Sequence, residues 1–166
     1  MSDFIMSLSD TSAGLLQVGG KGASLTRLVA AGLPVPDGFH VTTAAYEQFM
    51  TANNLGSEIA AALAGIDSAQ PATLEAAARR IRAVFEAGQI PDAIAAEIAV
   101  AYVALGEPAV AVRSSATAED LPELSFAGQQ ETYLNVQGVP AVLTAVALLG
   151  LIVDAARHRL PPAVRH

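Results

Sequence analysis

The chain has 166 residues and a formal net charge of −7, with no cysteine and no tryptophan. This length fits one domain or a piece of a larger one, and 52% hydrophobic against 15% charged residues favours a folded core over disorder. The acidic balance, with no visible basic patch, argues against nucleic acid as a partner, and the lack of cysteine excludes a disulfide scaffold, thiol catalysis and a cysteine metal site.

The N-terminal third predicts two helices separated by a short strand. After a lead-in that has room for a short strand, residues 19–22 form a glycine-rich turn, and a helical pattern follows it. Gly32 ends that helix in the position that follows the C-cap. Residues 38–41 predict a strand, and Thr42 or Thr43 can cap the next helix.

The middle of the chain is rich in alanine, and its apolar residues recur every three or four positions. Helices are therefore predicted over residues 57–63, 73–87 and 91–105. The period then changes, because residues 109–112 form a continuous apolar run that ends at Arg113 and predicts a buried strand. A polar loop, a strand over 131–136 and a last helix from Pro140 complete a mixed α/β (α+β) domain.

No targeting or membrane segment is predicted. Residues 1–6 lack the basic start and apolar run of a secretory signal. The mean hydropathy of +0.43 comes from alanine, and the apolar stretch over 139–153 is shorter than the roughly 20 residues that span a bilayer. We therefore expect a cytoplasmic protein without membrane association.

Lys21 is the single lysine of the chain, and it lies between glycines just before a predicted helix. This setting suits an anion, because small residues let backbone N–H groups approach and the helix N-terminus adds partial positive charge. A solvated lysine in a turn is the alternative, and the segment alone leaves both open. A P-loop does not fit, because Gly20 stands where its lysine belongs and no strand precedes.

Arg113 marks a second candidate site, since ligands of α/β folds often lie at strand ends and a guanidinium offers a planar fork of donors to phosphate oxygens. The hydroxyl residues that follow it and Gly128 suit a loop over a polyanion. The alternative is a surface loop in which Arg113 pairs with Glu119 or Asp120. Spacing alone does not separate these readings.

Other polar residues are weaker candidates. His40 lies in a short apolar strand and is expected to be structural, and the three histidines have no metal-ligand spacing. Arg79, Arg80 and Arg82 are expected on the wet face of their helix, with contact to a phosphate as the alternative.

Four motifs in order resemble the start of the phosphoenolpyruvate synthase and pyruvate phosphate dikinase family, a module that rifampicin phosphotransferase shares. They are Val18–Leu25, Gly32–Phe39, Val112–Pro122 and Ser125–Asn135. The resemblance covers about residues 10–146. It implies the N-terminal portion of an ATP-grasp nucleotide-binding domain, often called the PEP/pyruvate-binding domain.

The resemblance also implies a set of ATP-binding residues. In the family, the lysine of the Gly-Gly-Lys motif and the arginine of the Arg-Ser-Ser motif contact ATP phosphates, which places these roles on Lys21 and Arg113. The glycine and threonine of the Gly-Gln-Gln-Glu-Thr motif line the nucleotide site, which adds Gly128 and Thr132. From the residues alone, Thr132 would be only a strand residue.

The family enzymes are several times longer than this chain, and they pass a phosphoryl group from ATP through a histidine to pyruvate or to the antibiotic. Their Mg²⁺-binding carboxylates and acceptor histidine lie in regions that this resemblance does not cover. We therefore expect an ATP-binding portion of a phosphoenolpyruvate synthase-like kinase, with no complete catalytic or metal site and no activity alone. The alternatives are part of a rifampicin phosphotransferase or a stand-alone nucleotide-binding module.

The pattern of the family stops after Val146. Back-translated with permitted codons and read one base later, the following residues give Arg-Cys-Trp-Ala-Ser-Leu-Trp-Thr-Pro-Arg-Gly-Ile-Ala-Tyr-Arg, which is similar to the continuation of family members. This similarity predicts a frameshift, with a partial ATP-grasp domain over 1–146 and an out-of-frame tail over 147–166. Such a tail is expected to extend the last helix through Val153 without finding a matching groove, so that its deletion costs little stability.

Overall fold

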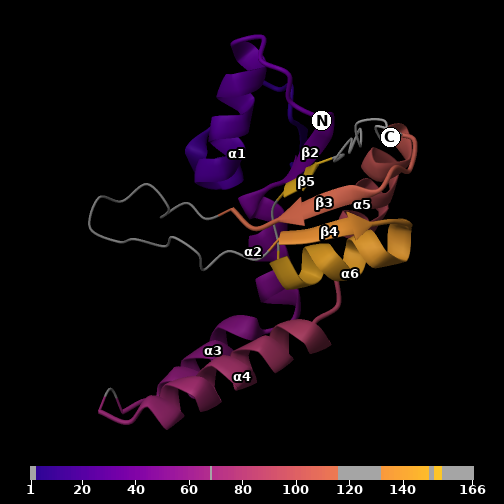
Figure 1. The fold of residues 1–166 in the computed structure, drawn as a ribbon. Helices are drawn as coiled ribbons and strands as arrows, with labels where there is room; N and C mark the ends of the chain where they lie inside the picture. The colour runs from indigo at the N-terminus through magenta and orange to yellow at the C-terminus, as the bar shows by residue number, and fades with distance from the viewer. Residues whose placement is uncertain (1–2, 68, 116–131, 150–151, 155–166) are drawn as a thin grey trace, which may run out of the picture.

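The computed structural model describes residues 3–67, 69–115, 132–149 and 152–154. It confirms the mixed α/β fold, with helices arranged around one five-stranded sheet (Figure 1). The elements are β1 Ile5–Ser7, α1 Leu15–Ala30, β2 Gly38–Val41, α2 Thr43–Ala52, α3 Leu55–Leu63, α4 Pro71–Ala87, α5 Asp92–Ala104, β3 Val110–Arg113, β4 Thr132–Val136, α6 Val139–Leu149 and β5 Ile152–Asp154.

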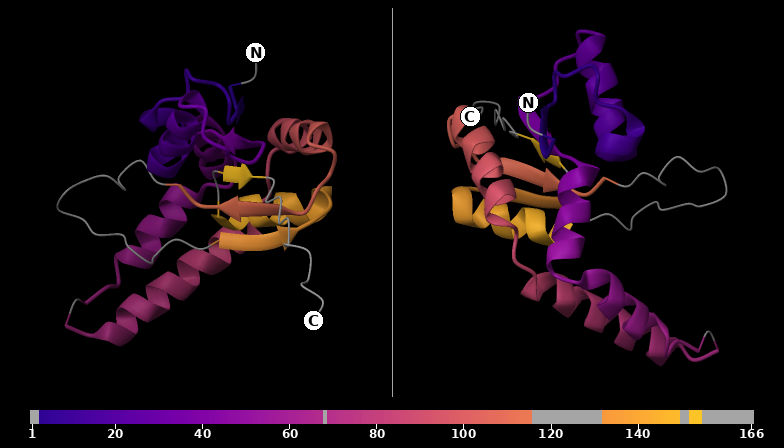
Figure 2. Two further views of the ribbon diagram at one scale, coloured as in Figure 1. Left: turned by 45° about the horizontal axis from the view of Figure 1, so that its top comes forward. Right: turned by 180° about the vertical axis from the view of Figure 1, so that it is seen from behind.

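The sheet has the strand order β1-β2-β5-β3-β4, and every neighbouring pair is antiparallel. The short strand β5 lies between β2 and β3 and pairs with both, as the left view of Figure 2 shows for β3. One register row crosses four strands: His40 of β2, Ile152 of β5, Arg113 of β3 and Thr132 of β4. Residues directly opposite one another share a face of the sheet, so this row defines one face.

The strand β5 corrects the expectation for the tail. The last helix ends at Leu149, and Ile152–Asp154 is a strand rather than a continuation of the helix. Isoleucine and valine are β-branched and fit a pleated strand well, and the facing edges of β2 and β3 supply backbone partners on both sides. The expectation that this segment finds no partner is therefore wrong for residues 152–154.

The core lies on the opposite face of the sheet from the register row. It is formed by β2, β3 and the helices α2, α5 and α6, with these buried side chains: Phe39, Val41, Ala45, Ile94, Ile98, Tyr102, Val110, Val112, Val142, Ala145 and Val146. The hydroxyl of Tyr102 donates to the carbonyl of Pro108 at 2.8 Å and accepts from the N–H of Gly138 at 2.9 Å. One buried tyrosine thus fastens the segment after α5 to the start of α6.

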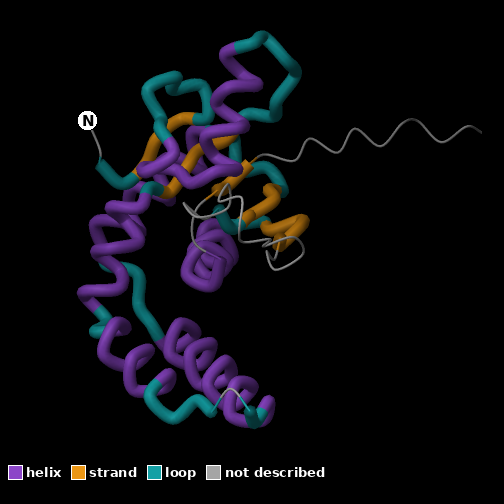
Figure 3. The backbone as a smooth tube through the Cα atoms, turned by 90° about the vertical axis from the view of Figure 1, so that its left-hand side faces the viewer, coloured by secondary structure: helices purple, strands orange, loops and turns teal. Residues whose placement is uncertain are grey.

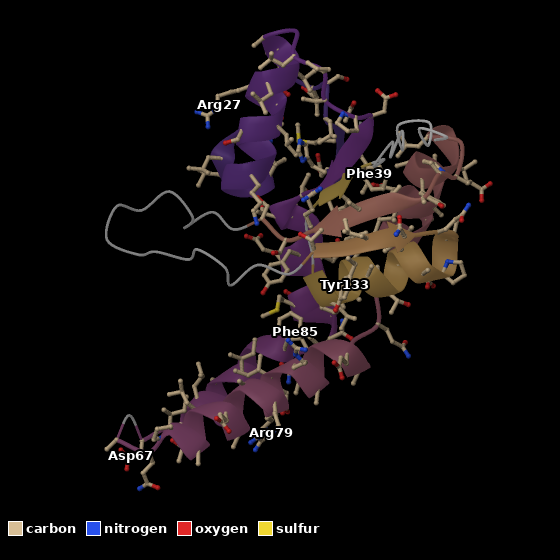
Figure 4. The ribbon with its side chains drawn as sticks, viewed as in Figure 1. Arg27, Phe39, Asp67, Arg79, Phe85 and Tyr133 are labelled. Carbon is tan, nitrogen blue, oxygen red and sulfur yellow. The ribbon has the colours of Figure 1, made fainter. Side chains whose placement is uncertain are left out.

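Helices α3 and α4 form a hairpin that extends away from the sheet, with α2 leading into it (Figures 1 and 3). At its base, the ring of Phe85 lies 6.5 Å from that of Tyr46 and 6.2 Å from that of Phe49. The wet face predicted for α4 is confirmed, because Arg79 and Arg80 are exposed and pair with acidic groups on the hairpin surface; Arg79 is labelled in Figure 4. No helix in the described part of the chain is long and apolar enough to cross a bilayer.

Candidate functional site

The glycine-rich segment lies inside helix α1 and is not a turn in front of it. Gly19 alone leaves the helical conformation, with φ 71° and ψ 177°, so α1 consists of two helical stretches with a break between them. A side chain at Gly19 would require an unfavourable left-handed φ, and its Cβ would collide with the hydroxyl of Ser115. The predicted turn is therefore wrong in extent, because a single glycine supplies the break.

The break gives α1 a second N-terminus directly before Lys21. The first N–H groups of a helical stretch have no carbonyl partner in a preceding turn. One of them is satisfied across the fold, because the N–H of Gly22 donates to Oγ of Ser115 at 3.3 Å in a buried position. The peptide dipoles of this helical stretch also place partial positive charge beside the single lysine of the chain.

Lys21 contacts the segment that carries Arg113. Its Nζ donates to the carbonyl oxygen of Ser114 at 3.3 Å, although the two residues are 93 positions apart. The next residue, Ser115, is buried and holds the N–H of Gly22. Two hydrogen bonds therefore join the Gly-Gly-Lys and Arg-Ser-Ser motifs directly.

Arg113 and Thr132 lie beside each other on neighbouring strands. They are directly opposite in the register of β3 and β4, so both side chains are on the face of the register row, where α1 also lies. Arg113 is half-buried and Thr132 is exposed. Lys21 thus contacts the residue that follows Arg113, and Arg113 lies opposite Thr132 in the β3–β4 ladder. Gly128 lies outside the described residues, as do Glu119 and Asp120.

His40 belongs to this region, although the sequence predicts only a structural role for it. The side chain is fully buried, and its Nε2 lies 3.3 Å from Oγ1 of Thr26 on α1. Burial lowers the pKa of His40 from its ordinary value of 6.5 to about 4, and the nearby carboxylate of Asp10 opposes this shift only in part. The imidazole is therefore neutral at pH 7. No local sequence pattern points to this contact, because it joins a helix to a strand.

A separate cavity of about 410 Å³ lies between α4, α6 and β4. It is lined by Ala78, Ile81, Arg82, Phe85, Glu86, Tyr133 and Leu148. Phe85 and Tyr133 lie close together in the view of Figure 4. Because successive side chains of a strand alternate between faces, Tyr133 points to the other side of the sheet from Thr132. This cavity is therefore distinct from the region around Lys21.

Among the residues that the structure describes, no group of three or more histidine, cysteine, aspartate or glutamate side chains is placed to hold a metal ion. The region on the α1 face carries two cationic side chains. They comprise an ammonium and a guanidinium, together with the N-terminal end of a helical stretch. This combination suits an anion with several oxygen atoms.

Comparison with known proteins identifies the family to which the sequence of this chain is similar. The model of the family described as "Pyruvate phosphate dikinase, AMP/ATP-binding domain" matches residues 15–149. A "probable phosphoenolpyruvate synthase" of Methanocaldococcus jannaschii is 46% identical over 134 residues, 77% of this chain and 11% of the relative. The phosphoenolpyruvate synthase of Aeropyrum pernix is 46% identical over 150 residues, 86% of this chain and 18% of the relative.

A rifampicin phosphotransferase of a Streptomyces species is 44% identical over 146 residues, which are 86% of this chain and 17% of the relative. The chain thus spans less than a fifth of the length of each of these three curated relatives. The family match extends from the start of α1 to the end of α6 and takes in both motifs that meet at Lys21. The resemblance inferred from four motifs is thereby confirmed, and the chain belongs to the pyruvate phosphate dikinase AMP/ATP-binding domain family.

Proposed function

We propose that the face of the sheet carrying Lys21, Arg113 and Thr132 binds the phosphate groups of ATP, as part of an ATP-grasp domain. The observation that carries this proposal is the 3.3 Å contact between Nζ of Lys21 and the carbonyl of Ser114, next to Arg113. That contact places the ammonium of Lys21 against the residue that follows Arg113, in a chain whose net charge is −7. The family description, which names an AMP/ATP-binding domain, supports a nucleotide as the anion.

Each proposed contact follows from the chemistry of its group. A phosphate oxygen is ionised, so it is a stronger acceptor for the ammonium of Lys21 than a neutral carbonyl. The guanidinium of Arg113 can engage two phosphate oxygens at once. Thr132 offers a hydroxyl on the adjacent strand, and we place Gly128 beside it on the basis of the resemblance.

We infer that phosphoryl transfer requires groups beyond those described in this chain. Such a reaction requires groups that position the phosphates and neutralise their charge, and it also requires Mg²⁺ ligands and an acceptor histidine. The described residues offer no cluster for Mg²⁺, and no metal step is assigned to them. The proposed role is the ATP-binding portion of a phosphoenolpyruvate synthase-like phosphotransferase, inactive alone and cytoplasmic. Identities of 46% and 44% to the two kinds of relative leave pyruvate and antibiotic as acceptors.

Calorimetric titration of the full chain with ATP tests the site. Replacement of Lys21 by Met keeps the length of the side chain and removes its charge, and it should weaken ATP binding roughly tenfold or more. The matched control is Arg79→Met on the hairpin, which removes one positive charge far from the site and should change the Kd less than about twofold. Absence of ATP binding by the wild-type chain, or equal losses in both variants, would refute the assignment.

A second assay addresses the reaction. The full chain, incubated with ATP and pyruvate or rifampicin, should form no phosphorylated product above background. Turnover that disappears in Lys21→Met would show that the chain is an enzyme by itself.

The origin of residues 147–166 stays a separate proposal. We infer that they are encoded in a shifted frame, because the back-translated segment read one base later resembles the continuation of the family. Resequencing the gene around the codon for Val146 tests this. A corrected sequence that continues in the family-like frame would support the inference, and an unchanged sequence would contradict it. The strand β5 shows that part of this segment nevertheless pairs with the sheet.

A further inference from the structure

A series of buried hydrogen-bonding groups lies next to residues 20–22 of α1, which we call the lysine segment. Oγ1 of Thr26 donates to the carbonyl oxygen of Gly22 at 3.2 Å, and Nε2 of His40 lies 3.3 Å from the same Oγ1. At the other end, the N–H of Gly22 donates to Ser115 at 3.3 Å. Both polar groups of Gly22 thus contact buried side chains, the N–H that of Ser115 from across the fold and the carbonyl that of Thr26, one turn later on α1.

The protons on these groups can be assigned from the hydrogen bonds. A threonine hydroxyl has one hydrogen, and here it is given to the carbonyl of Gly22. Nε2 of His40 must then carry a hydrogen and donate to Thr26, which leaves Nδ1 as the unprotonated nitrogen. Nδ1 is buried and has no hydrogen-bond partner among the described residues, so a proton placed there would gain no acceptor.

We propose that neutral His40 is a positioning residue for Lys21, acting through Thr26 and Gly22. This inference rests on the proposed function, in that Lys21 is taken as the phosphate contact. Thr26 holds the carbonyl of Gly22 and Ser115 holds its N–H, so the two peptide planes that meet at the Cα of Gly22 are both fixed. The plane of the N–H includes the carbonyl of Lys21, so fixing Gly22 fixes the backbone from which the lysine side chain extends.

The packing around Gly22 supports the same role. A Cβ added at Gly22 would lie 3.2 Å from Cε1 of His40 and 2.8 Å from Cβ of Val18. The imidazole therefore fits closely under the backbone of the lysine segment, in space that only a glycine leaves open.

Protonation of His40 should loosen this support. The imidazolium would be a buried cation beside Gly22, near the positive end of a helical stretch, with Asp10 as the charged group that acts on it from the segment before α1. Burial lowers the pKa of His40 to about 4. The imidazole of the folded chain therefore stays largely neutral down to about pH 5, and the positioning effect is lost as the pH falls through 4.

Two substitutions of His40 distinguish the effect of its hydrogen bond from the effect of its side-chain volume. His40→Gln keeps an N–H donor for Thr26 and cannot titrate, whereas His40→Leu keeps comparable volume and removes the donor. Thr26→Val removes the hydroxyl with little change of shape. Thr51→Val is the matched control, because Thr51 makes the same type of bond to the carbonyl four residues earlier, at 2.8 Å, on the exposed surface of α2.

The first measurement is hydrogen exchange of the Gly22 amide by NMR at pH 7, without ATP. His40→Leu and Thr26→Val should each speed exchange of this amide roughly threefold to tenfold, and the double variant should add little to either. His40→Gln and Thr51→Val should leave it within about twofold of wild type. Wild-type exchange in His40→Leu and Thr26→Val, or equally fast exchange in His40→Gln, would overturn the inference.

The second measurement is the Kd for ATP from about pH 7.5 to about pH 3.5, a range that includes the pKa of His40 of about 4. Phosphate groups also titrate near pH 6, so the ratio of wild-type to His40→Gln values is the quantity that counts. The ratio should stay constant down to about pH 5, and below that wild type should lose affinity relative to His40→Gln. A ratio that stays constant through about pH 4 would contradict the role of the neutral imidazole. If wild type binds no ATP at pH 7.5, the proposed function fails, while the Gly22 exchange data still decide whether His40 positions the segment.

Discussion

The lysine segment of α1 and the α3–α4 hairpin are built on opposite principles. The lysine segment is held by hydrogen bonds to residues 93 positions away, in buried surroundings, and it depends on a glycine that no other residue replaces. The hairpin consists of two neighbouring helices with exposed ion pairs on its surface. The comparison teaches that the proposed site draws its geometry from the whole sheet, whereas the hairpin depends mainly on its own local sequence.

Removal of β5, on which the sheet depends, should cause the largest loss in the free energy of unfolding. A chain that stops after residue 149 loses pairing on both sides, and buried backbone groups of β2 and β3 lose their partners at roughly 1–3 kcal/mol each. We expect a loss of at least about 4 kcal/mol in the free energy of unfolding, measured by guanidinium denaturation. A chain that stops after Asp154 keeps both ladders and is the control; equal midpoints for the two truncations would show that β5 contributes nothing.

Substitution of Gly19 by Ala should have the next largest effect. The left-handed φ of 71° and the collision with Ser115 together should cost about 3 kcal/mol in chemical denaturation. The control is Gly56→Ala on α3, where an added Cβ meets nothing within 4 Å and helix propensity should raise stability by about 0.5 kcal/mol. Similar effects of the two substitutions would contradict the contrast between site and hairpin.

Acid should destabilise the site side of the molecule through His40. Its pKa is about 4 in the folded chain against 6.5 ordinarily, so the unfolded chain binds more protons between these values. The His40 contribution to stability is therefore present above pH 6.5 and falls away as the pH drops to 4, by up to about 3 kcal/mol. Denaturation midpoints of wild type and His40→Gln, compared across this range, measure the effect, and parallel curves would exclude it.

The smallest effect is expected for an ion pair of the hairpin. Glu58→Gln removes the partner of Arg80, whose guanidinium lies 3.4 Å from the carboxylate with both side chains about half exposed. Exposed pairs of this kind contribute little, so the free energy of unfolding should change by less than about 0.5 kcal/mol. A loss comparable to that of Gly19→Ala would mean that the hairpin is coupled to the sheet.

Local sequence patterns predict the elements whose partners are near in sequence. The strand over 38–41 and the helix beginning at Pro91–Asp92 occur almost at their predicted positions, because alternation and helical periodicity are local signals. The strand β5 was not predicted, since a run rich in leucine and alanine favours helix until two open strand edges are present on either side. Secondary structure at residues 152–154 is therefore decided by tertiary contacts.

The residues of the candidate site also differ in how well the sequence alone predicts them. Lys21 and Arg113 stand out from their residue types and neighbours, and the structure brings their segments into contact. Thr132 is marked only by the family resemblance, because a threonine in a strand has no distinguishing pattern. The link from His40 to Gly22 escapes sequence reasoning altogether, since it joins a strand to a helix through one threonine hydroxyl.

The position of β5 has a consequence for the order in which the molecule assembles during translation. The ribosome makes β2 and β3 long before residues 152–154, so the two halves of the sheet exist for a time without the strand that joins them. During that interval each half has an open edge, which a chaperone or another nascent chain can engage. The row that runs from His40 to Arg113 closes only when its connecting strand leaves the exit tunnel, so the proposed phosphate site is completed later than either half of the sheet.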